Sequence, residues 1–264
     1  MPAEIDRPAS LSALPVRRFW GWGYQHEQLS APERQAIHGL VGLLGGNAAH
    51  AATEPTLAEF ALRAPRIAAP PALAPVLSDR PYDRLTHSLG KGYADCLRMW
   101  LRDVPHVPDW VAFPRSEAEV VDLLDWAAGR NVAVVPFGGG TSVVGGVEPD
   151  VGAGYAATLS LDLERLDRVL EVDRTSRAAR IQAGVLGPLL EAQLRPHGLT
   201  LRHYPQSFQF STLGGWIATR AGHHPGQAVE PHRHQRPGQQ ADPGPGGGLG
   251  APPDEYRYFV CRSW

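Results

Sequence analysis

The sequence contains very little cysteine. Among its 264 residues only Cys96 and Cys261 occur, too few for a disulfide framework of the kind that holds small secreted domains together. Residues 1–12 include Glu4 and Asp6 and no apolar stretch, so they do not resemble a signal peptide. We therefore expect a protein of the reducing cytoplasm.

An excess of positive charge and a long apolar run are also missing. The formal net charge is −2, so no basic field is expected to attract nucleic acid or an anionic membrane. No apolar run approaches the ~20 residues that a transmembrane helix needs. The sequence is nevertheless 43% hydrophobic and 20% charged, a composition that permits a buried core. Nucleic-acid-binding and membrane-spanning proteins are therefore not favoured.

The most informative stretch of the chain runs from residue 132 to residue 146. Val132–Val135 is apolar and β-branched, which predicts a buried strand. The strand runs into Pro136 and then into a loop with five glycines. Because glycine has no Cβ, the backbone N–H groups of such a loop can approach a bound anion closely. The loop therefore predicts a phosphate or diphosphate site, and a glycine-rich hairpin without a ligand is the alternative.

Two common phosphate-binding motifs do not fit this loop. A dinucleotide-binding fingerprint counted from Gly138 needs a small residue where Val143 stands, and a helix directly behind the loop. A Walker A loop needs a lysine and a hydroxyl residue after its last glycine, and Gly145 is followed by Gly146 and Val147. The prediction is thus a diphosphate loop that carries no lysine.

A small α/β unit leads into this loop. Residues 110–113 are predicted as a strand, and Ser116 and Glu119 as a capping box that starts a helix ending at Gly129. This order places the loop at the carboxyl end of its strand, where open α/β sheets bind ligands. Further on we predict a strand at 158–163, a hairpin of 169–172 with 180–183, and a helix at 186–194.

The N-terminal part of the chain is predicted to be helical. Residues 31–44 and 82–102 carry apolar residues at helical spacing, although two glycines weaken the second stretch. His87 in that stretch is expected to be a surface or capping histidine rather than a catalytic one. The aromatic segment 17–24 is expected to pack as a plug against the core.

Two separate motifs resemble one family. Pro136–Ser142 resembles the diphosphate loop of FAD-binding flavoproteins of the vanillyl-alcohol-oxidase and p-cresol-methylhydroxylase (PCMH) type. Residues 205–222 are very similar to the second flavin segment of alkyldihydroxyacetonephosphate synthases, and the resemblance covers roughly residues 19–222. It implies FAD as the cofactor, bound by these residues: Pro136, Phe137, Gly138, Gly139, Gly140, Thr141, Ser142, Gln206, Ser207, Phe208, Gln209, Phe210, Ser211, Thr212, Thr219, Arg220, Ala221 and Gly222.

The resemblance also implies an activity. It favours ether-lipid synthesis, in which a fatty alcohol replaces the acyl group of acyl-dihydroxyacetone phosphate without net redox change. Oxidation of a 2-hydroxy acid such as lactate or glycolate is the alternative, and an inactive FAD-binding fragment is a third. The FAD is expected to be non-covalent, the substrate a small molecule or lipid, and the intact family member a homodimer. The catalytic residues stay unassigned.

The expected fold is α+β. A helical N-terminal region (1–104) is followed by a PCMH-type FAD-binding domain of two α/β subdomains (105–222), incomplete at its C-terminus. Residues 223–264 are rich in Pro, Gly and His, so we expect a disordered, aberrant tail and an inactive chain. The tail includes four histidines without a nearby carboxylate pattern, so no metal site is predicted: His223, His224, His232 and His234.

Overall fold

The computed structural model describes residues 15–46, 53–175, 178–221 and the strand at 260–262. The helices are α1 Ala31–Leu43, α2 Pro81–Thr86, α3 Tyr93–Trp100, α4 Glu117–Gly129, α5 Gly187–Leu194 and α6 Leu213–Ala218. The strands are β1 Leu77–Ser78, β2 Trp110–Ala112, β3 Val132–Phe137, β4 Ala157–Asp162, β5 Val169–Asp173, β6 Ala178–Ile181 and β7 Val260–Arg262. The mixture of helices and strands confirms the predicted α+β class.

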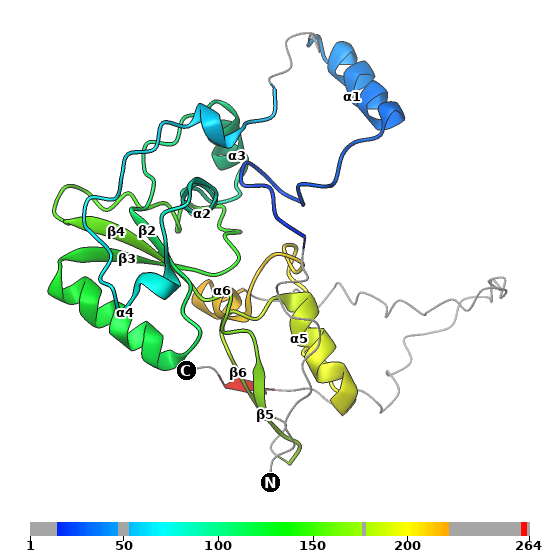
Figure 1. Ribbon diagram of the computed structural model, residues 1–264. Helices are drawn as coiled ribbons and strands as arrows, with labels where there is room; N and C mark the ends of the chain where they lie inside the picture. The colour runs from blue at the N-terminus through cyan, green and yellow to red at the C-terminus, as the bar shows by residue number, and fades with distance from the viewer. Residues whose placement is uncertain (1–14, 47–52, 176–177, 222–259, 263–264) are drawn as a thin grey trace, which may run out of the picture.

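The first sheet has the strand order β1-β2-β4-β3, with β2, β4 and β3 parallel and β1 antiparallel to β2. Helix α4 lies along one face of this sheet (Figure 1). Its residues Leu123 and Ala127 are buried against Val132 of β3 and Leu159 of β4. The predicted strand, helix and strand are therefore present, and the glycine loop follows the carboxyl end of β3.

The start of α4 differs from the predicted capping box. The Ser116 hydroxyl accepts a hydrogen bond from the Glu119 N–H at 3.2 Å, as expected. The Glu119 carboxylate, however, accepts the N–H of Arg115 at 2.5 Å rather than that of Ser116. Glu119 also forms an ion pair with the Arg115 side chain, so both of its contacts at this end of α4 are with the residue before Ser116.

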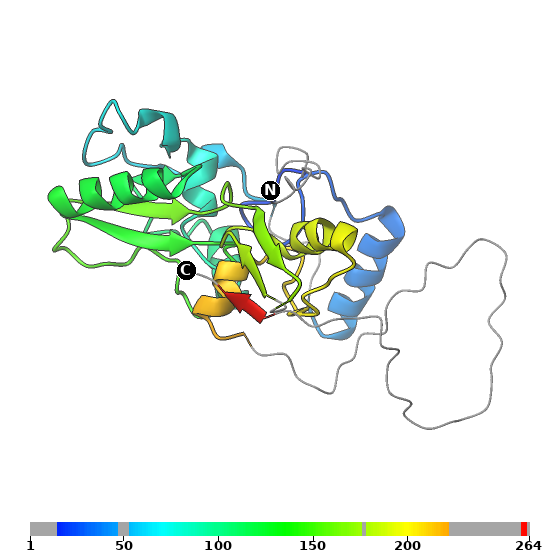
Figure 2. The same cartoon turned by 90° about the horizontal axis from the view of Figure 1, so that it is seen from below.

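The second sheet has the order β5-β6-β7, and α5 and α6 pack beside it (Figure 2). Strands β5 and β6 form the predicted antiparallel hairpin, and β7 adds to β6 in parallel. The core of this unit contains Val185, Leu190, Leu213 and Trp216. Two small α/β subdomains are thus present. Of the range 223–264 only β7 is described, so its disorder, its histidines and the predicted domain boundaries stay predictions.

The N-terminal region departs from prediction in two places. The helix expected over residues 82–102 is two helices, α2 and α3, because the chain breaks at Gly90 and Gly92 to approach the glycine loop. Tyr93 and Leu97, two of the residues whose helical spacing predicted the helix, are exposed on α3. Helix α1 forms as predicted, but none of its residues is buried.

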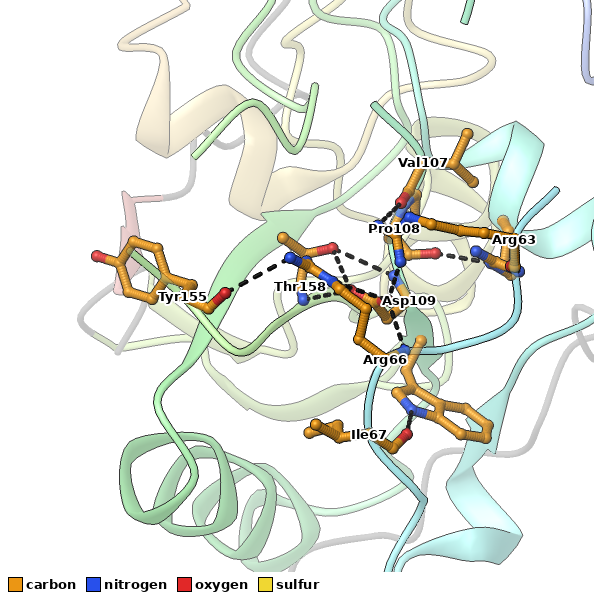
Figure 3. Close-up of polar contacts among 10 residues, drawn as sticks. Arg63, Arg66, Ile67, Val107, Pro108, Asp109, Tyr155 and Thr158 are labelled. Atoms are coloured by element: carbon orange, nitrogen blue, oxygen red, sulfur yellow. Dashed lines mark hydrogen bonds and ion pairs between the residues drawn. The ribbon is translucent and has the colours of Figure 1, made fainter. Parts of the chain in front are cut away.

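A buried carboxylate joins this region to the first sheet (Figure 3). Asp109 has no exposed side-chain surface, and both Arg63 and Arg66 form ion pairs with it. Arg66 donates from Nη2 at 2.8 Å, and the Thr158 backbone N–H of β4 donates at 2.7 Å. Burial alone would raise the pKa of Asp109, but hydrogen bonds from Arg66 and Arg63 outweigh it and hold the pKa well below its usual range. The cluster is therefore an ionic cross-link between the 63–66 segment, β2 and β4.

His87 is the C-cap residue of α2, as one half of its expectation had it, but it is buried, so the expected surface position is wrong. Its ring is buried, with Nδ1 2.6 Å from the Asp83 carbonyl oxygen and Nε2 2.8 Å from the Asp162 carboxylate at the end of β4. The ring also packs 4.0 Å from that of Phe137, the last residue of β3. Residues distant in sequence supply all of these partners except Asp83, so the pattern of α2 alone does not reveal them.

Candidate functional site

The two predicted cofactor segments meet in the structure. A Cβ placed on Gly139 would lie 1.8 Å from the carbonyl oxygen of Phe210, and one on Gly138 would lie 2.4 Å from Thr212 Oγ1. Glycine is therefore required at both positions by the closeness of the second segment. Thr212 itself caps α6, because its hydroxyl accepts the N–H of Gly215 at 3.3 Å. The packing of α6 thus sets the position of the glycine loop.

The glycine loop leaves several backbone donors uncommitted. Gly140 has a left-handed φ of 66° and turns the chain over the ring of Phe137. Gly139 does not have positive φ, so close approach rather than backbone freedom explains its glycine. Within the described residues, the N–H groups of Gly139, Gly140 and Thr141 donate no hydrogen bond to another residue. Unpaired N–H groups on consecutive residues are the donor set that an anion binds.

Arg17 connects the two segments. It donates from Nη1 to the Gly139 carbonyl oxygen at 2.9 Å and from Nη2 to the Phe210 carbonyl oxygen at 3.1 Å. Its guanidinium also lies 5.2 Å from the centre of the Phe210 ring. The ring of Trp22 packs edge-on against the same phenylalanine at 5.7 Å. The segment 17–24 therefore covers the site, while Phe19 forms the predicted aromatic plug in the N-terminal core.

These elements enclose a small hollow beside the glycine loop. Three cations line it, and no carboxylate does: the lining residues are Arg17, Arg18, Gly21, Trp22, Gly23, Thr86, Lys91, Phe137, Gly139, Gly140, Thr141 and Phe210. Sequence reasoning did not single out Arg17 or Lys91 as site residues. Two features of the sequence could have pointed to these residues: the aromatic segment next to Arg17, and the glycines on both sides of Lys91.

The remaining predicted residues are more dispersed. Ser142 turns its hydroxyl oxygen back to the loop, where it accepts the N–H of Gly146 at 3.1 Å. Gln206 and Gln209 are exposed, and Phe208 packs on Gly187 and Trp216. Thr219 and Arg220 lie exposed beyond α6, away from its capped end at Thr212, and Gly222 lies outside the described residues. The geometry therefore brings together 137–141 with 210–212 but not the residues after α6.

An acidic pair lies at the end of β4, next to Phe137. Asp162 accepts the Glu164 N–H at 2.8 Å with one carboxylate oxygen and contacts His87 with the other. Burial, followed by the negative charge of Asp162, raises the pKa of Glu164 to about 7. The Glu164 carboxyl is therefore expected to titrate close to neutral pH, next to the strand that carries the glycine loop.

The residues present fit FAD by their chemistry. Its diphosphate needs hydrogen-bond donors and positive charge, and the loop N–H groups, the Thr141 hydroxyl, Arg17 and Lys91 supply both. No group of metal-ligating side chains occurs among the residues that the structure describes. Nor is any helix in the described ranges long and apolar enough to cross a membrane.

Comparison with known proteins agrees with this chemistry. Residues 108–235 match the family model of the FAD binding domain. Alkyldihydroxyacetonephosphate synthase from Dictyostelium discoideum is 43% identical over 148 residues, which is 56% of this chain and 24% of the relative. The same enzyme from Trypanosoma brucei brucei is 43% identical over 139 residues, 53% of this chain and 23% of the relative.

Solved structures give the same result. A structure of alkyldihydroxyacetonephosphate synthase superposes with a TM-score of 0.67 at 29% identity, covering 81% of this chain and 44% of that one.

A D-2-hydroxyglutarate dehydrogenase from Xanthomonas citri pv. viticola is also similar in sequence, 36% identical over 128 residues, 47% of this chain and 25% of the relative. This chain matches only about a quarter of the length of these curated relatives.

Proposed function

We propose that this chain, whose residues 108–235 match the family model of the FAD binding domain, holds FAD across the junction of its two subdomains. In this proposal it forms the cofactor-binding part of a flavoenzyme similar to alkyldihydroxyacetonephosphate synthase. In this proposal the loop 136–142 binds the diphosphate and residues 206–212 line the rest of the cofactor, whereas the predicted role of residues 219–222 has no support in the geometry. FAD, when bound, supplies the reactive ring system, and the protein supplies its position and its electrostatic surroundings.

One observation carries the proposal: the glycine loop and the second segment pack so closely that glycine is required at 138 and 139. Arg17 hydrogen-bonds to both segments at once and holds them in register. The N–H groups of Gly139, Gly140 and Thr141 meanwhile remain available to an anion. A glycine-rich hairpin without a ligand would explain neither the close packing of the second segment nor the three cations that line the hollow.

The substrate in this proposal is acyl-dihydroxyacetone phosphate, and the reaction replaces its acyl group with a fatty alcohol. The support is the 43% identity to the alkyldihydroxyacetonephosphate synthases of Dictyostelium discoideum and Trypanosoma brucei brucei. The dehydrogenase at 36% identity supports oxidation of a 2-hydroxy acid as the second candidate. A cytoplasmic location and a homodimer belong to the same proposal, and light scattering of the purified protein tests the latter.

Equilibrium dialysis followed by product analysis tests this proposal. The chain is dialysed against FAD, and retained flavin is measured from its visible absorbance. The loaded protein is then given acyl-dihydroxyacetone phosphate with a fatty alcohol, or a D-2-hydroxy acid with an artificial dye. Retained flavin supports the cofactor assignment, and its absence overturns it. An alkyl ether product selects the first activity, reduction of the dye selects the second, and flavin without either product leaves a binding module.

A further inference from the structure

The chain contains 25 basic residues, and Lys91 is its only lysine. It lies between α2 and α3, outside the stretch that matches the FAD-binding family model. Its backbone N–H donates to the carbonyl oxygen of Ser142 at 2.7 Å, at the end of the glycine loop. A Cβ on the preceding Gly90 would lie 2.2 Å from that same oxygen. The lysine is therefore fixed to the loop by its own main chain.

The ammonium group of Lys91 has no carboxylate partner among the residues that the structure describes. Its Nζ donates to the Phe19 carbonyl oxygen at 3.0 Å, and none of the ion pairs in the described ranges includes it. It lines the hollow with Arg17 and Thr141. Burial lowers the pKa of Lys91 to about 8; Cys96 and Asp95 act in the opposite direction, and Arg17 lowers it further. A partly buried cation beside other cations is costly unless an anion joins it.

We propose that Lys91 binds the diphosphate of FAD and so supplies, from a separate segment, the cation that the glycine loop lacks in its own sequence. The inference rests on the proposed cofactor function and adds a residue to its site. Two of the three ammonium donors remain after the bond to Phe19, which suits a phosphate group with several acceptor oxygens. The short path from Ser142 to Lys91 keeps the charge next to the loop donors.

The single lysine permits a direct test without any activity assay. The full chain is treated with an amine-reactive reagent, and modification of Lys91 is followed by peptide mass spectrometry. The α-amino group serves as the internal control. FAD and ADP are expected to slow modification of Lys91 at least about fivefold, while adenosine, which has no phosphate, is not. Equal protection by adenosine, or no protection by FAD that is demonstrably bound, would overturn the proposal.

Variants give a second, independent readout. Lys91→Met is expected to weaken FAD and ADP binding about tenfold or more, and Lys91→Arg less, since it keeps the charge. The matched control is Arg130→Met, which removes one exposed cation at the opposite end of β3 and should leave affinity within about twofold. Melting temperatures of the apo-proteins show whether each variant folds. A folded Lys91→Met protein with unchanged affinity contradicts the proposal.

The pH dependence of FAD binding tests whether the charge of Lys91, and not only the shape of its side chain, contributes to affinity. FAD affinity of the wild type is expected to fall as pH rises above about 8, and that of Lys91→Met to stay flat over the same range. The Cys96→Ser variant shows whether the nearby thiol contributes to this pH dependence. A wild type that binds no FAD at all would refute the cofactor assignment, whereas a wild type that binds with no role for Lys91 would refute this inference alone.

Discussion

Gly139 is the residue at which the two cofactor segments come closest. Its backbone conformation is ordinary, and the reason for glycine is the Phe210 carbonyl oxygen, which leaves no room for a methyl group. Arg17 then bonds to the carbonyl oxygens of both residues. The loop can therefore pack against the second segment only because residue 139 has no Cβ.

Gly139→Ala is therefore expected to weaken both the fold and cofactor binding. The methyl group forces the two segments apart, and overpacking of this kind costs about 1–3 kcal/mol. The measurements are the free energy of unfolding in urea and the flavin retained after dialysis against FAD. Gly154→Ala is the control, because a Cβ there meets nothing within 4 Å. If the two variants behave alike, the close approach of the segments has no energetic role.

Glu164 provides a pH-dependent prediction at the same scale. Its pKa is raised to about 7 in the folded protein and is about 4.3 in an unfolded chain. The folded state therefore binds the proton more tightly, so its contribution to stability is complete below about pH 4 and is lost as pH rises through 7. Glu164→Gln, which cannot ionise, should lose less stability than the wild type between about pH 4.5 and pH 7.5. Thermal melts across this range test it, and parallel curves would contradict the assigned pKa.

At the scale of elements, contacts between distant segments explain what the sequence could and could not predict. The apolar run of β3, the Ser116 cap of α4 and the hairpin of β5 with β6 are local patterns, and they were predictable. The break between α2 and α3 was not, because Gly90 is required by Ser142, far away in the sequence. The positions of Lys91 and Arg17 in the site depend on the same kind of contact.

The Asp109 cluster tests how strongly the N-terminal region is attached to the first sheet. Asp109→Asn removes the charge that two arginines and the Thr158 N–H share. Breaking a buried pair costs about 3–5 kcal/mol, and we expect the lower end because Arg63 and Arg66 are partly exposed and can regain water. Denaturant unfolding measures the change.

The matched control for that cluster is the exposed pair of Arg115 with Glu119 on α4. Arg115→Gln should cost less than about 1 kcal/mol, because surface ion pairs contribute little. Asp109→Asn with an equally small cost would mean that the cluster does not hold the two parts together.

At the scale of the whole molecule, the site is assembled from three parts of the chain. The segment 17–24 and the α2–α3 connection cover the glycine loop from one side, and the second subdomain supplies 210–212. The FAD-binding family model covers only residues 108–235, so the N-terminal region adds groups that the model does not include.

The most direct test of the central claim is an isothermal titration of the purified 264-residue chain with FAD, repeated in the presence of ADP. The account predicts one FAD bound per chain, and displacement by ADP, since the diphosphate provides the main anchor at the glycine loop. Gly139→Ala, titrated alongside, should bind markedly less. A chain that takes up no FAD, or that binds FAD with no competition from ADP, would contradict the assignment of this loop as the diphosphate site.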